Sequence, residues 1–158
     1  MTTRDELILD YAKDPFLSQS LLSFLCGKHI GSGCYRDVFE YGLDSNYVIK
    51  IQRDLGKFSN IIEWEIWCTL MYTEYAKHFA GCKFLSPDGR ILIQRKTQPI
   101  TDKRKAPENI PHFFSDIKDS NFGFIGKQFV AHDYDYSMVK FINSGLTKRT
   151  KKYKSHLK

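Results

Sequence analysis

The sequence predicts an α+β fold that combines a five-stranded antiparallel sheet with one long helix. Residues 28–52 are punctuated by glycine and rich in aromatic and β-branched residues, with "DSN" between two alternating runs, a pattern that predicts two or three antiparallel strands. The segment "CKFLSPDGRILIQRK" predicts a further hairpin that turns at "PDG". Between them, residues 60–78 contain neither glycine nor proline, begin with an asparagine suited to an N-cap and stop before Gly81, which favours a helix.

The remaining segments complete the expected order of elements. Residues 4–25 have apolar side chains at helical spacing, interrupted by Pro15, and predict two short helices. Residues 99–111, "PITDKRKAPENIP", are typical of a charged connector, and "FGFI", "GK" and "QFVAHDYD" then predict a final hairpin. The chain has no apolar run of about 18 residues and no basic-then-apolar leader, so we expect a cytoplasmic protein without a membrane segment.

Most of the positive charge is concentrated at the C-terminal end. The chain has a net charge of +6, yet without "TKRTKKYKSHLK" it has 18 basic and 18 acidic residues. We expect residues 147–158 to form a poorly ordered tail, or one that only a partner holds. Such a tail attracts the phosphates of nucleic acid weakly and without specificity, so nucleic acid is a secondary alternative as a partner.

The four cysteines are widely separated in the sequence and form no C-x-x-C pair. They are Cys26, Cys34, Cys68 and Cys82. This spacing favours reduced, mostly buried thiols over a zinc site or a disulfide framework.

The first segment with candidate chemistry is "IGSGCYRDVF". Gly31 and Gly33 lie where two strands are expected to meet in a turn. A glycine has no Cβ, so backbone amides at such a turn can approach a phosphate closely. Turn geometry alone is the alternative explanation for two glycines in a hairpin.

The second segment is "NYVIKIQ", in which Lys50 shares one strand face with Val48 and Gln52. A lysine on a strand usually points to water, whereas an inward lysine needs an anion because burying an unpaired ammonium group is costly. The predicted helix offers two acids. Glu63 interrupts an apolar stripe and is preferred as the partner of Lys50 over Glu65, which lies on a more mixed face.

The third segment, "SDIKDSNFGFIGKQFVAHDYD", places acids at both ends of the final hairpin. Asp116 and Asn121 have the spacing D-x-x-x-x-N with Lys118 between them, and Asp133 follows on the far arm. Because a hairpin brings its ends together, Asn121 and Asp133 can converge on one cation. Two oxygen ligands that leave room for water and phosphate suit Mg²⁺. The alternative is a surface turn with solvated acids.

The order of these features resembles that of the protein-kinase-like superfamily, over residues 30–135. "IGSGCYRDV" is similar to the glycine-rich loop, "YVIK" to the strand with the phosphate-binding lysine, "DIKDSN" to the catalytic loop and "HDYD" to the metal-binding motif. The chain also resembles short kinase-like proteins of bacteriophages, whose setting is the host cytoplasm. The resemblance implies a minimal kinase-like domain at residues 29–146 with its C-lobe largely absent. The helical segment at 1–28 precedes this domain, and the basic tail at 147–158 follows it.

The resemblance implies ATP as a cofactor, bound by the first half of the domain. The residues that would contact the nucleotide are Gly31, Gly33, Val38, Val48 and Lys50. The two glycines would cover the phosphates, the two valines would enclose the adenine, and the lysine would hold the α- and β-phosphates. Glu63 would orient the lysine, and residues 94–96 would form the hinge to the second half.

The resemblance also assigns roles for phosphoryl transfer to the second half. Asp116 would receive the proton of the substrate hydroxyl, Lys118 would neutralise charge on the γ-phosphoryl group, and Asn121 and Asp133 would hold Mg²⁺. The chain departs from the family pattern at Arg36, which stands where a third loop glycine is usual. Only 25 residues follow Asp133, which leaves no room for a helical subdomain that docks peptides.

Two functions of different class follow from these features. One is a minimal ATP- and Mg²⁺-dependent phosphotransferase. The other is a non-catalytic, pseudokinase-like module that captures or inhibits a host or partner protein, with nucleotide optional. A small mixed domain with accidental motif matches is the third interpretation. We expect nucleotide and a protein as partners and no membrane, and a homodimer is a further alternative.

Overall fold

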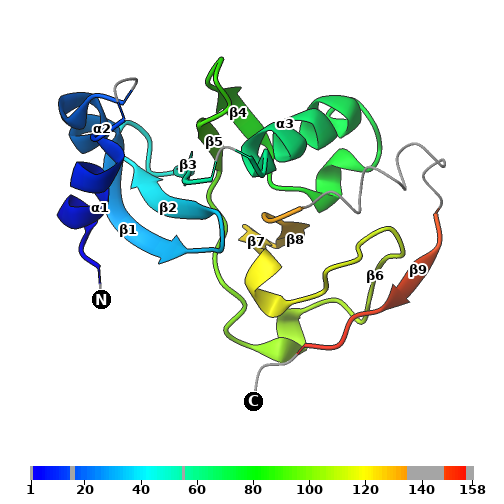
Figure 1. Ribbon diagram of the computed structural model, residues 1–158. Helices are drawn as coiled ribbons and strands as arrows, with labels where there is room; N and C mark the ends of the chain where they lie inside the picture. The colour runs from blue at the N-terminus through cyan, green and yellow to red at the C-terminus, as the bar shows by residue number, and fades with distance from the viewer. Residues whose placement is uncertain (1, 15–16, 55, 135–147, 156–158) are drawn as a thin grey trace. The chain divides into compact units, whose positions relative to one another are not determined.

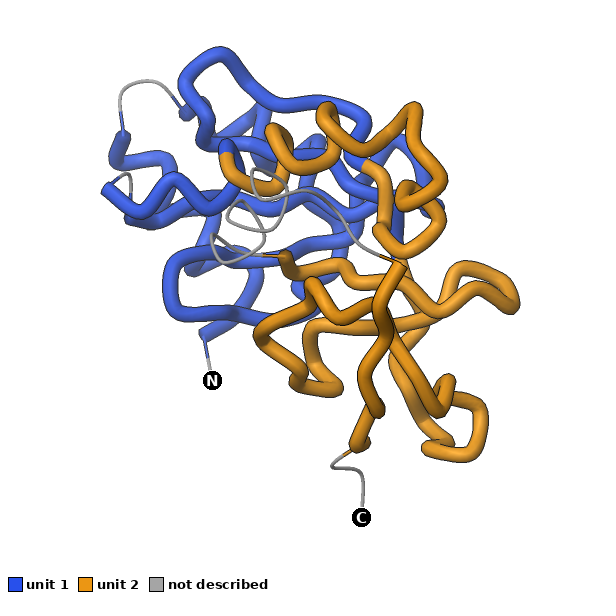
Figure 2. Tube along the Cα trace, turned by 90° about the vertical axis from the view of Figure 1, so that its right-hand side faces the viewer, with its two compact units in different colours: residues 1–61, 82–96 blue, residues 62–81, 97–158 orange. Residues whose placement is uncertain are grey.

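The computed structural model describes residues 2–14, 17–54, 56–134 and 148–155, and its fold class is α+β (Figure 1). The chain divides into two compact units (Figure 2). Unit 1 comprises residues 1–61 and 82–96, and unit 2 comprises residues 62–81 and 97–158. The boundary between Lys96 and Thr97 falls directly after the segment that the sequence predicts as a hinge.

Unit 1 contains the predicted five-stranded antiparallel sheet, which is thereby confirmed. The strand order is β1-β2-β3-β5-β4. The strands are β1 (Cys26–Ser32), β2 (Arg36–Tyr41), β3 (Tyr47–Gln52), β4 (Cys82–Leu85) and β5 (Ile91–Arg95). The turn between β4 and β5 contains Gly89 at φ +75°, a left-handed conformation that glycine adopts at no steric cost. The predicted "PDG" hairpin is therefore present.

Two short helices cover one face of this sheet, as Figure 1 shows. α1 (Arg4–Tyr11) begins with a capping box between Thr3 and Glu6, and α2 (Gln19–Leu25) begins after the N-cap Ser18. The shared core consists of Leu7, Ile8, Tyr11, Leu17, Leu22, Cys26, Phe39, Ile49, Ile51 and Ile91. Because side chains alternate along a strand, this core leaves the face of Lys50 on the other side of the sheet.

The third helix, α3 (Ser59–Leu70), is shorter than the sequence predicts. Its buried stripe of Ile62, Ile66 and Leu70 has the expected spacing of four residues. The helix ends at Leu70 because the Thr73 hydroxyl donates to the Leu70 carbonyl oxygen at 2.8 Å, and the Thr73 backbone N–H donates to the same oxygen at 2.8 Å. Only a 3₁₀ turn, η1 (Ala76–His78), follows within the predicted range.

Apart from the greater part of α3, the described residues of unit 2 form short strands and 3₁₀ turns. The predicted final hairpin is present as β7 (Phe122–Ile125) and β8 (Gln128–Ala131), with Gly126 at φ +60° in its two-residue turn. The connector holds η2 (Lys103–Lys105) and ends in β6 (Asn109–Pro111). Aromatic rings in mutual contact fill the interior: Phe79, Phe113, Phe114, Phe122, Phe129, Tyr134 and Tyr153.

The C-terminal segment differs from the predicted disordered tail. Residues 150–152 form β9 (Thr150–Lys152), which pairs with β6 in an antiparallel ladder. Tyr153 follows and is only 9% exposed, with its ring against Phe122 and Phe129. Strand pairing and the burial of this one aromatic ring offset the repulsion among the neighbouring lysines. The rest of the predicted tail, residues 147 and 156–158, lies outside the described residues.

Two further features concern membrane-spanning helices and the state of the cysteines. Among the helices that the structure describes, none has the length and apolar character that crossing a bilayer requires. All four cysteines are outside any disulfide bond, and Cys26 and Cys82 are buried, whereas Cys34 and Cys68 are exposed. Burial raises the pKa of the Cys26 thiol to about 12.

Candidate functional site

Lys50 is buried on the sheet face opposite α1 and α2. Its exposed fraction is 4%, so the inward interpretation of this lysine is confirmed. On β2, Val38 lies directly opposite Lys50, and Arg36 lies opposite Gln52. Residues directly opposite in an antiparallel pair share a face, so Arg36 and Lys50 lie on the same side of the sheet. Arg36 is 8% exposed, which gives this face two buried cations.

Asn60 ties this face together. The sequence suggests it as a helix N-cap, but it lies inside the first turn of α3 and is completely buried. Its side-chain amide donates to the carbonyl oxygen of Arg90 at 2.8 Å and to that of Lys50 at 3.3 Å. Its oxygen accepts from the Arg36 guanidinium at 3.3 Å. Asn60 therefore fixes the backbone at Lys50 and the guanidinium of Arg36 at the same time.

Burial distinguishes the two acids that the sequence offers as partners of Lys50. Glu63 is completely buried, whereas Glu65 is exposed. An ionised carboxylate is costly to bury without a cation or hydrogen-bond donors. This difference supports the choice of Glu63, and its pairing with Lys50 stays a prediction.

The glycine-rich loop joins β1 to β2 without any steric need for glycine. Gly31 ends up in β1, paired with Val38, and Gly33 donates its N–H to the Arg36 carbonyl oxygen at 2.8 Å. Neither residue has a positive φ. A Cβ on Gly31 would meet no atom within 4 Å, and one on Gly33 would come no closer than 3.8 Å to the protein. Turn geometry therefore does not explain why these two positions are glycine.

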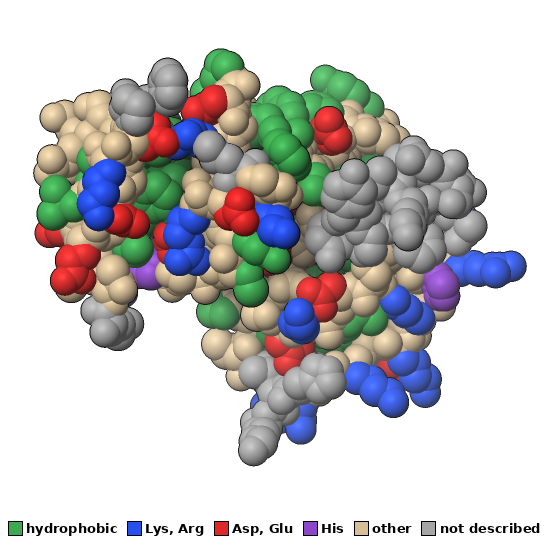
Figure 3. All heavy atoms as spheres, in the orientation of Figure 1, with side chains coloured by type: hydrophobic (Ala, Val, Ile, Leu, Met, Phe, Trp, Pro, Cys, Tyr) green, Lys and Arg blue, Asp and Glu red, His purple; other side chains and the backbone are tan. Residues whose placement is uncertain are grey.

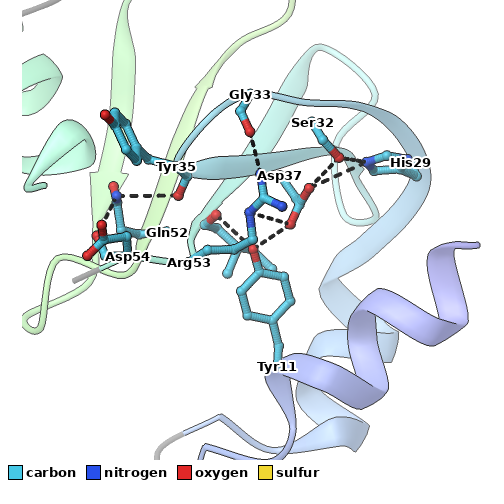
Figure 4. A network of polar contacts seen from close by, with 10 residues as sticks. Tyr11, His29, Ser32, Gly33, Tyr35, Asp37, Gln52, Arg53 and Asp54 are labelled. Atoms are coloured by element: carbon cyan, nitrogen blue, oxygen red, sulfur yellow. Dashed lines mark hydrogen bonds and ion pairs between the residues drawn. The ribbon is translucent and has the colours of Figure 1, made fainter. Parts of the chain in front are cut away.

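A buried carboxylate holds this loop from below (Figure 4). Asp37 is completely buried in β2. It accepts hydrogen bonds from the Tyr11 hydroxyl at 2.7 Å and from the Ser32 hydroxyl at 2.5 Å. The Arg53 guanidinium lies 3.4 Å from the same carboxylate and also donates to the Gly33 carbonyl oxygen. The carboxylate thus connects α1, both sides of the loop and the end of β3.

Sequence reasoning missed this network, although a signal was present. Asp37 alternates with Phe39 and Tyr41 on one face of β2, so an acid interrupts an apolar face there, as Glu63 does on α3. Burial and the hydrogen bond to Asp37 raise the pKa of the Tyr11 hydroxyl. The hydroxyl stays protonated and therefore remains a donor to the carboxylate.

A histidine beside this network invites comparison with a hydrolase triad. His29 Nε2 lies 3.2 Å from the Ser32 hydroxyl oxygen and 3.9 Å from Asp37. Both partners face the same ring nitrogen, and the serine proton goes to the aspartate. In a triad the serine and the acid face different nitrogens of the imidazole. The group is therefore a structural anchor of the loop and not a nucleophilic site.

In unit 2, three of the predicted catalytic-loop residues are in direct contact. The Lys118 ammonium lies 3.1 Å from Asp116 Oδ2, and Asn121 donates its side-chain N–H to the same oxygen at 3.0 Å. Asn121 also donates to the Asp116 backbone carbonyl at 3.2 Å. The asparagine is only 8% exposed, whereas Asp116 and Lys118 are exposed. A buried amide therefore orients an accessible carboxylate.

The two predicted metal ligands are brought together through the backbone. The Asn121 carbonyl oxygen accepts from the N–H groups of His132 at 2.9 Å and Asp133 at 3.3 Å. The His132 ring donates from Nε2 to the Ser120 carbonyl oxygen at 2.8 Å and so fixes the same turn. The Asp133 side chain is exposed. The described residues include no cluster of three or more His, Cys, Asp or Glu side chains placed to hold a metal ion. The last acid of the segment from residue 115 to residue 135, Asp135, lies outside the described residues.

The residues that follow β9 also contact the loop that contains Asp116 and Asn121. The hydroxyl of Tyr153 donates to Asp119, which also accepts from the Ser155 hydroxyl at 3.1 Å. Burial, followed by the hydrogen bond to Asp119, raises the pKa of the Tyr153 hydroxyl. Because Asp119 begins η3 (Asp119–Asn121), this contact restrains the turn that carries Asn121.

The candidate residues thus fall into two groups, one in each unit. Unit 1 contains Gly31, Gly33, Val38, Val48 and Lys50, and unit 2 contains Glu63, Asp116, Lys118, Asn121 and Asp133. Within each unit the residues have the local environment described above, and their joint action across the units stays a prediction. No protein-family model matches the chain, and no curated protein matches it.

Proposed function

We propose that the protein is a minimal kinase-like phosphotransferase that uses ATP and Mg²⁺, with a substrate that carries a hydroxyl group. The observation that carries the proposal is the contact of Asp116 with both Lys118 and Asn121, beside the backbone of Asp133. An exposed acid with an adjacent cation and an adjacent amide oxygen is suited to accept a proton while a phosphoryl group is neutralised next to it.

The proposed reaction uses these groups as follows. The substrate hydroxyl oxygen attacks the γ-phosphorus of ATP, the bond from that phosphorus to the β,γ-bridging oxygen breaks, and ADP leaves. The hydroxyl proton passes to the Asp116 carboxylate, and the Lys118 ammonium offsets negative charge on the transferred group. The expected products are the phosphorylated substrate and ADP.

Unit 1 supports the nucleotide part of the proposal. Arg36 and Lys50 are two cations on one sheet face, which suits the binding of an anion. The backbone of Gly31 and Gly33 can be approached from outside, because a Cβ at either position would meet only open space or ordinary contact distances. A ligand that lies close to the loop would explain why these two positions are glycine, which the fold itself does not explain.

Asn121 and Asp133 carry side-chain oxygens, the type of ligand that Mg²⁺ prefers. Asn121 donates from its amide nitrogen to Asp116, so its amide oxygen would be the ligand atom, and the exposed Asp133 carboxylate would add a second oxygen. Two protein oxygens with the remaining positions for water and phosphate are usual for this ion. When bound, Mg²⁺ would neutralise charge on the nucleotide phosphates.

The test separates binding from transfer. Asp133→Asn is expected to abolish the thermal stabilisation of the protein by ATP with Mg²⁺, whereas Asp116→Asn should keep that stabilisation and lose transfer of label from γ-labelled ATP by about two orders of magnitude or more. Asp10→Asn is the matched control, since Asp10 is an exposed acid on α1 and both activities should persist there. If neither site variant changes binding or transfer, the phosphotransferase proposal is refuted.

One observation favours the alternative, a non-catalytic module that binds a partner protein. The segment after the predicted metal motif returns as β9 and pairs with β6, so the described part of the chain has no helical platform for a protein substrate. In that case a partner protein would be captured by wild type and by both site variants equally. Equal capture together with absent transfer would select this function.

A further inference from the structure

The strand β9 displays lysines on one side only. Lys151 turns inward, where its ammonium group donates to the Phe114 carbonyl oxygen, and Tyr153 is buried on the same side. Lys152 and Lys154 alternate with them and are exposed. Arg149, just before the strand, is exposed as well, although the same alternation places it on the side of Lys151. Pairing with β6 therefore fixes Lys152 and Lys154 as two exposed cations on one side of this segment.

Figure 3 shows Lys and Arg side chains gathered over the part of unit 2 in which Figure 1 places β6 and β9. The acids near this surface offset only part of the charge. Glu74 pairs with Lys148 at 3.5 Å, and Glu108 is exposed directly before β6. The partly buried Asp119 accepts from the hydroxyls of Tyr153 and Ser155, on either side of Lys154. Lys152 and Lys154 are two residues apart in extended chain, about 6.6 Å along its direction. Such a spacing suits successive phosphates of an extended polynucleotide.

A pocket lies beside β6, the strand that pairs with β9. Its volume is about 210 Å³, and all three residues of β6, Asn109, Ile110 and Pro111, line it. Register pairs each of them with a residue of β9, so that Asn109 lies directly opposite Lys152. Directly opposite residues have Cβ atoms about 5 Å apart. One lining residue of the pocket, Asn109, and one exposed cation, Lys152, are therefore direct neighbours.

The residues that line the pocket are mostly aromatic or aliphatic, with a few polar side chains. Phe114, Phe122 and Phe129 line it, and so does Gln128, whose amide donates to the Lys77 carbonyl oxygen. Pockets for drug-sized ligands begin at about 300 Å³, so this one suits a single planar ring system. A ring that belongs to a ligand with adjacent negative charge would satisfy both the pocket and the lysines.

We propose that this surface, the β6–β9 ribbon with its aromatic pocket, binds single-stranded nucleic acid, with one base in the pocket and neighbouring phosphates on Lys152 and Lys154. Single-strand binding proteins combine a cationic track with aromatic side chains that take up bases. In a duplex the bases are stacked and paired, so the pocket selects a single strand. An acidic peptide has charge without an attached ring and would use the lysines alone.

The proposal is tested by fluorescence anisotropy with full-length protein and labelled oligothymidylate, at several salt concentrations. An abasic strand of equal length should bind about tenfold more weakly, as expected for the loss of one stacked base. The double variant Lys152→Ser with Lys154→Ser should reduce the slope of log affinity against log salt by about 0.7 for each lysine lost. The matched control is Lys13→Ser with Lys57→Ser, which removes two exposed lysines of unit 1 and should bind like wild type.

A pocket variant separates the base from the phosphates. Asn109→Leu places a larger aliphatic side chain in the pocket lining and should remove the preference over the abasic strand while the salt slope stays. Asn109 and both lysines are exposed, and unchanged thermal unfolding would show that the variants fold. Three results would overturn the proposal: equal binding of the abasic strand by wild type, equal loss in the unit 1 control, or tighter binding of oligoglutamate than of oligothymidylate.

Discussion

Each unit ties the loop that carries its candidate residues to a tyrosine near a chain end, but by different physical means. In unit 1 the Tyr11 hydroxyl donates to Asp37, which is completely buried and also contacts Ser32 and Arg53. In unit 2 the Tyr153 hydroxyl donates to Asp119, which is only partly buried.

The difference concerns what each anchor depends on. Around Asp37 the interactions are those of a buried charge, which is expensive to expose without its donors. Around Tyr153 the main interaction is ring packing against Phe122 and Phe129. We conclude that the loop of unit 1 is held chiefly by electrostatics and the loop of unit 2 chiefly by aromatic packing.

The largest expected effect is at Tyr153. Tyr153→Ala should lower the free energy of unfolding by about 3–5 kcal/mol because it removes a buried ring and leaves a cavity. Tyr153→Phe keeps the ring and should cost only about 1 kcal/mol, because water can reach the partly buried Asp119 and replace the lost donor. Urea unfolding measures both. Tyr72→Ala, at a side chain that is 90% exposed, is the control. Equal losses in the two Tyr153 variants would show that the hydroxyl is the anchor.

The next effect, about 3 kcal/mol, is expected for Asp37→Ala, because the Tyr11 hydroxyl and the Arg53 guanidinium lose their shared acceptor. Tyr11→Phe should cost about 1.5–3 kcal/mol, more than Tyr153→Phe, because Asp37 is completely buried and water cannot replace the lost donor there. The same urea experiment applies, with Asp10→Ala as an exposed control. The comparison between the units fails if Tyr11→Phe costs less than Tyr153→Phe.

The smallest effect is a pH dependence at His78, which lines the pocket of unit 2. Burial, with a smaller contribution from Lys77, lowers the pKa of His78 from its ordinary value. The unfolded chain then binds the proton more readily than the folded chain. The stability that neutral His78 provides is complete above its unfolded pKa of about 6.5 and decreases as the pH falls through the folded pKa.

His78→Gln should therefore make the melting temperature less dependent on pH between about 7.5 and about 5.5. His112→Gln, at an exposed histidine, is the control for the removal of a histidine side chain as such. A pH profile of His78→Gln identical to that of wild type would assign the pH dependence to other groups.

The sequence by itself determined the elements that depend on near neighbours. Alternation over a few residues was sufficient to place Lys50 opposite the Ile49 and Ile51 face, and turn residues such as Gly89 and Gly126 marked the two hairpins. Strand alternation has a period of two residues, and turn preferences act within four, so a short window contains the information.

The tertiary structure alone decided the features that join distant segments. Asp37 meets Tyr11 across 26 residues, and β9 meets β6 across about forty, so no local pattern predicts either contact. A run of lysines is typical of a solvated tail, yet one aromatic residue, Tyr153, with a matching strand edge makes it part of the core. Ordering such a segment depends on the partners that folding brings to it, because its own residues offer too little apolar surface to offset the lost chain entropy.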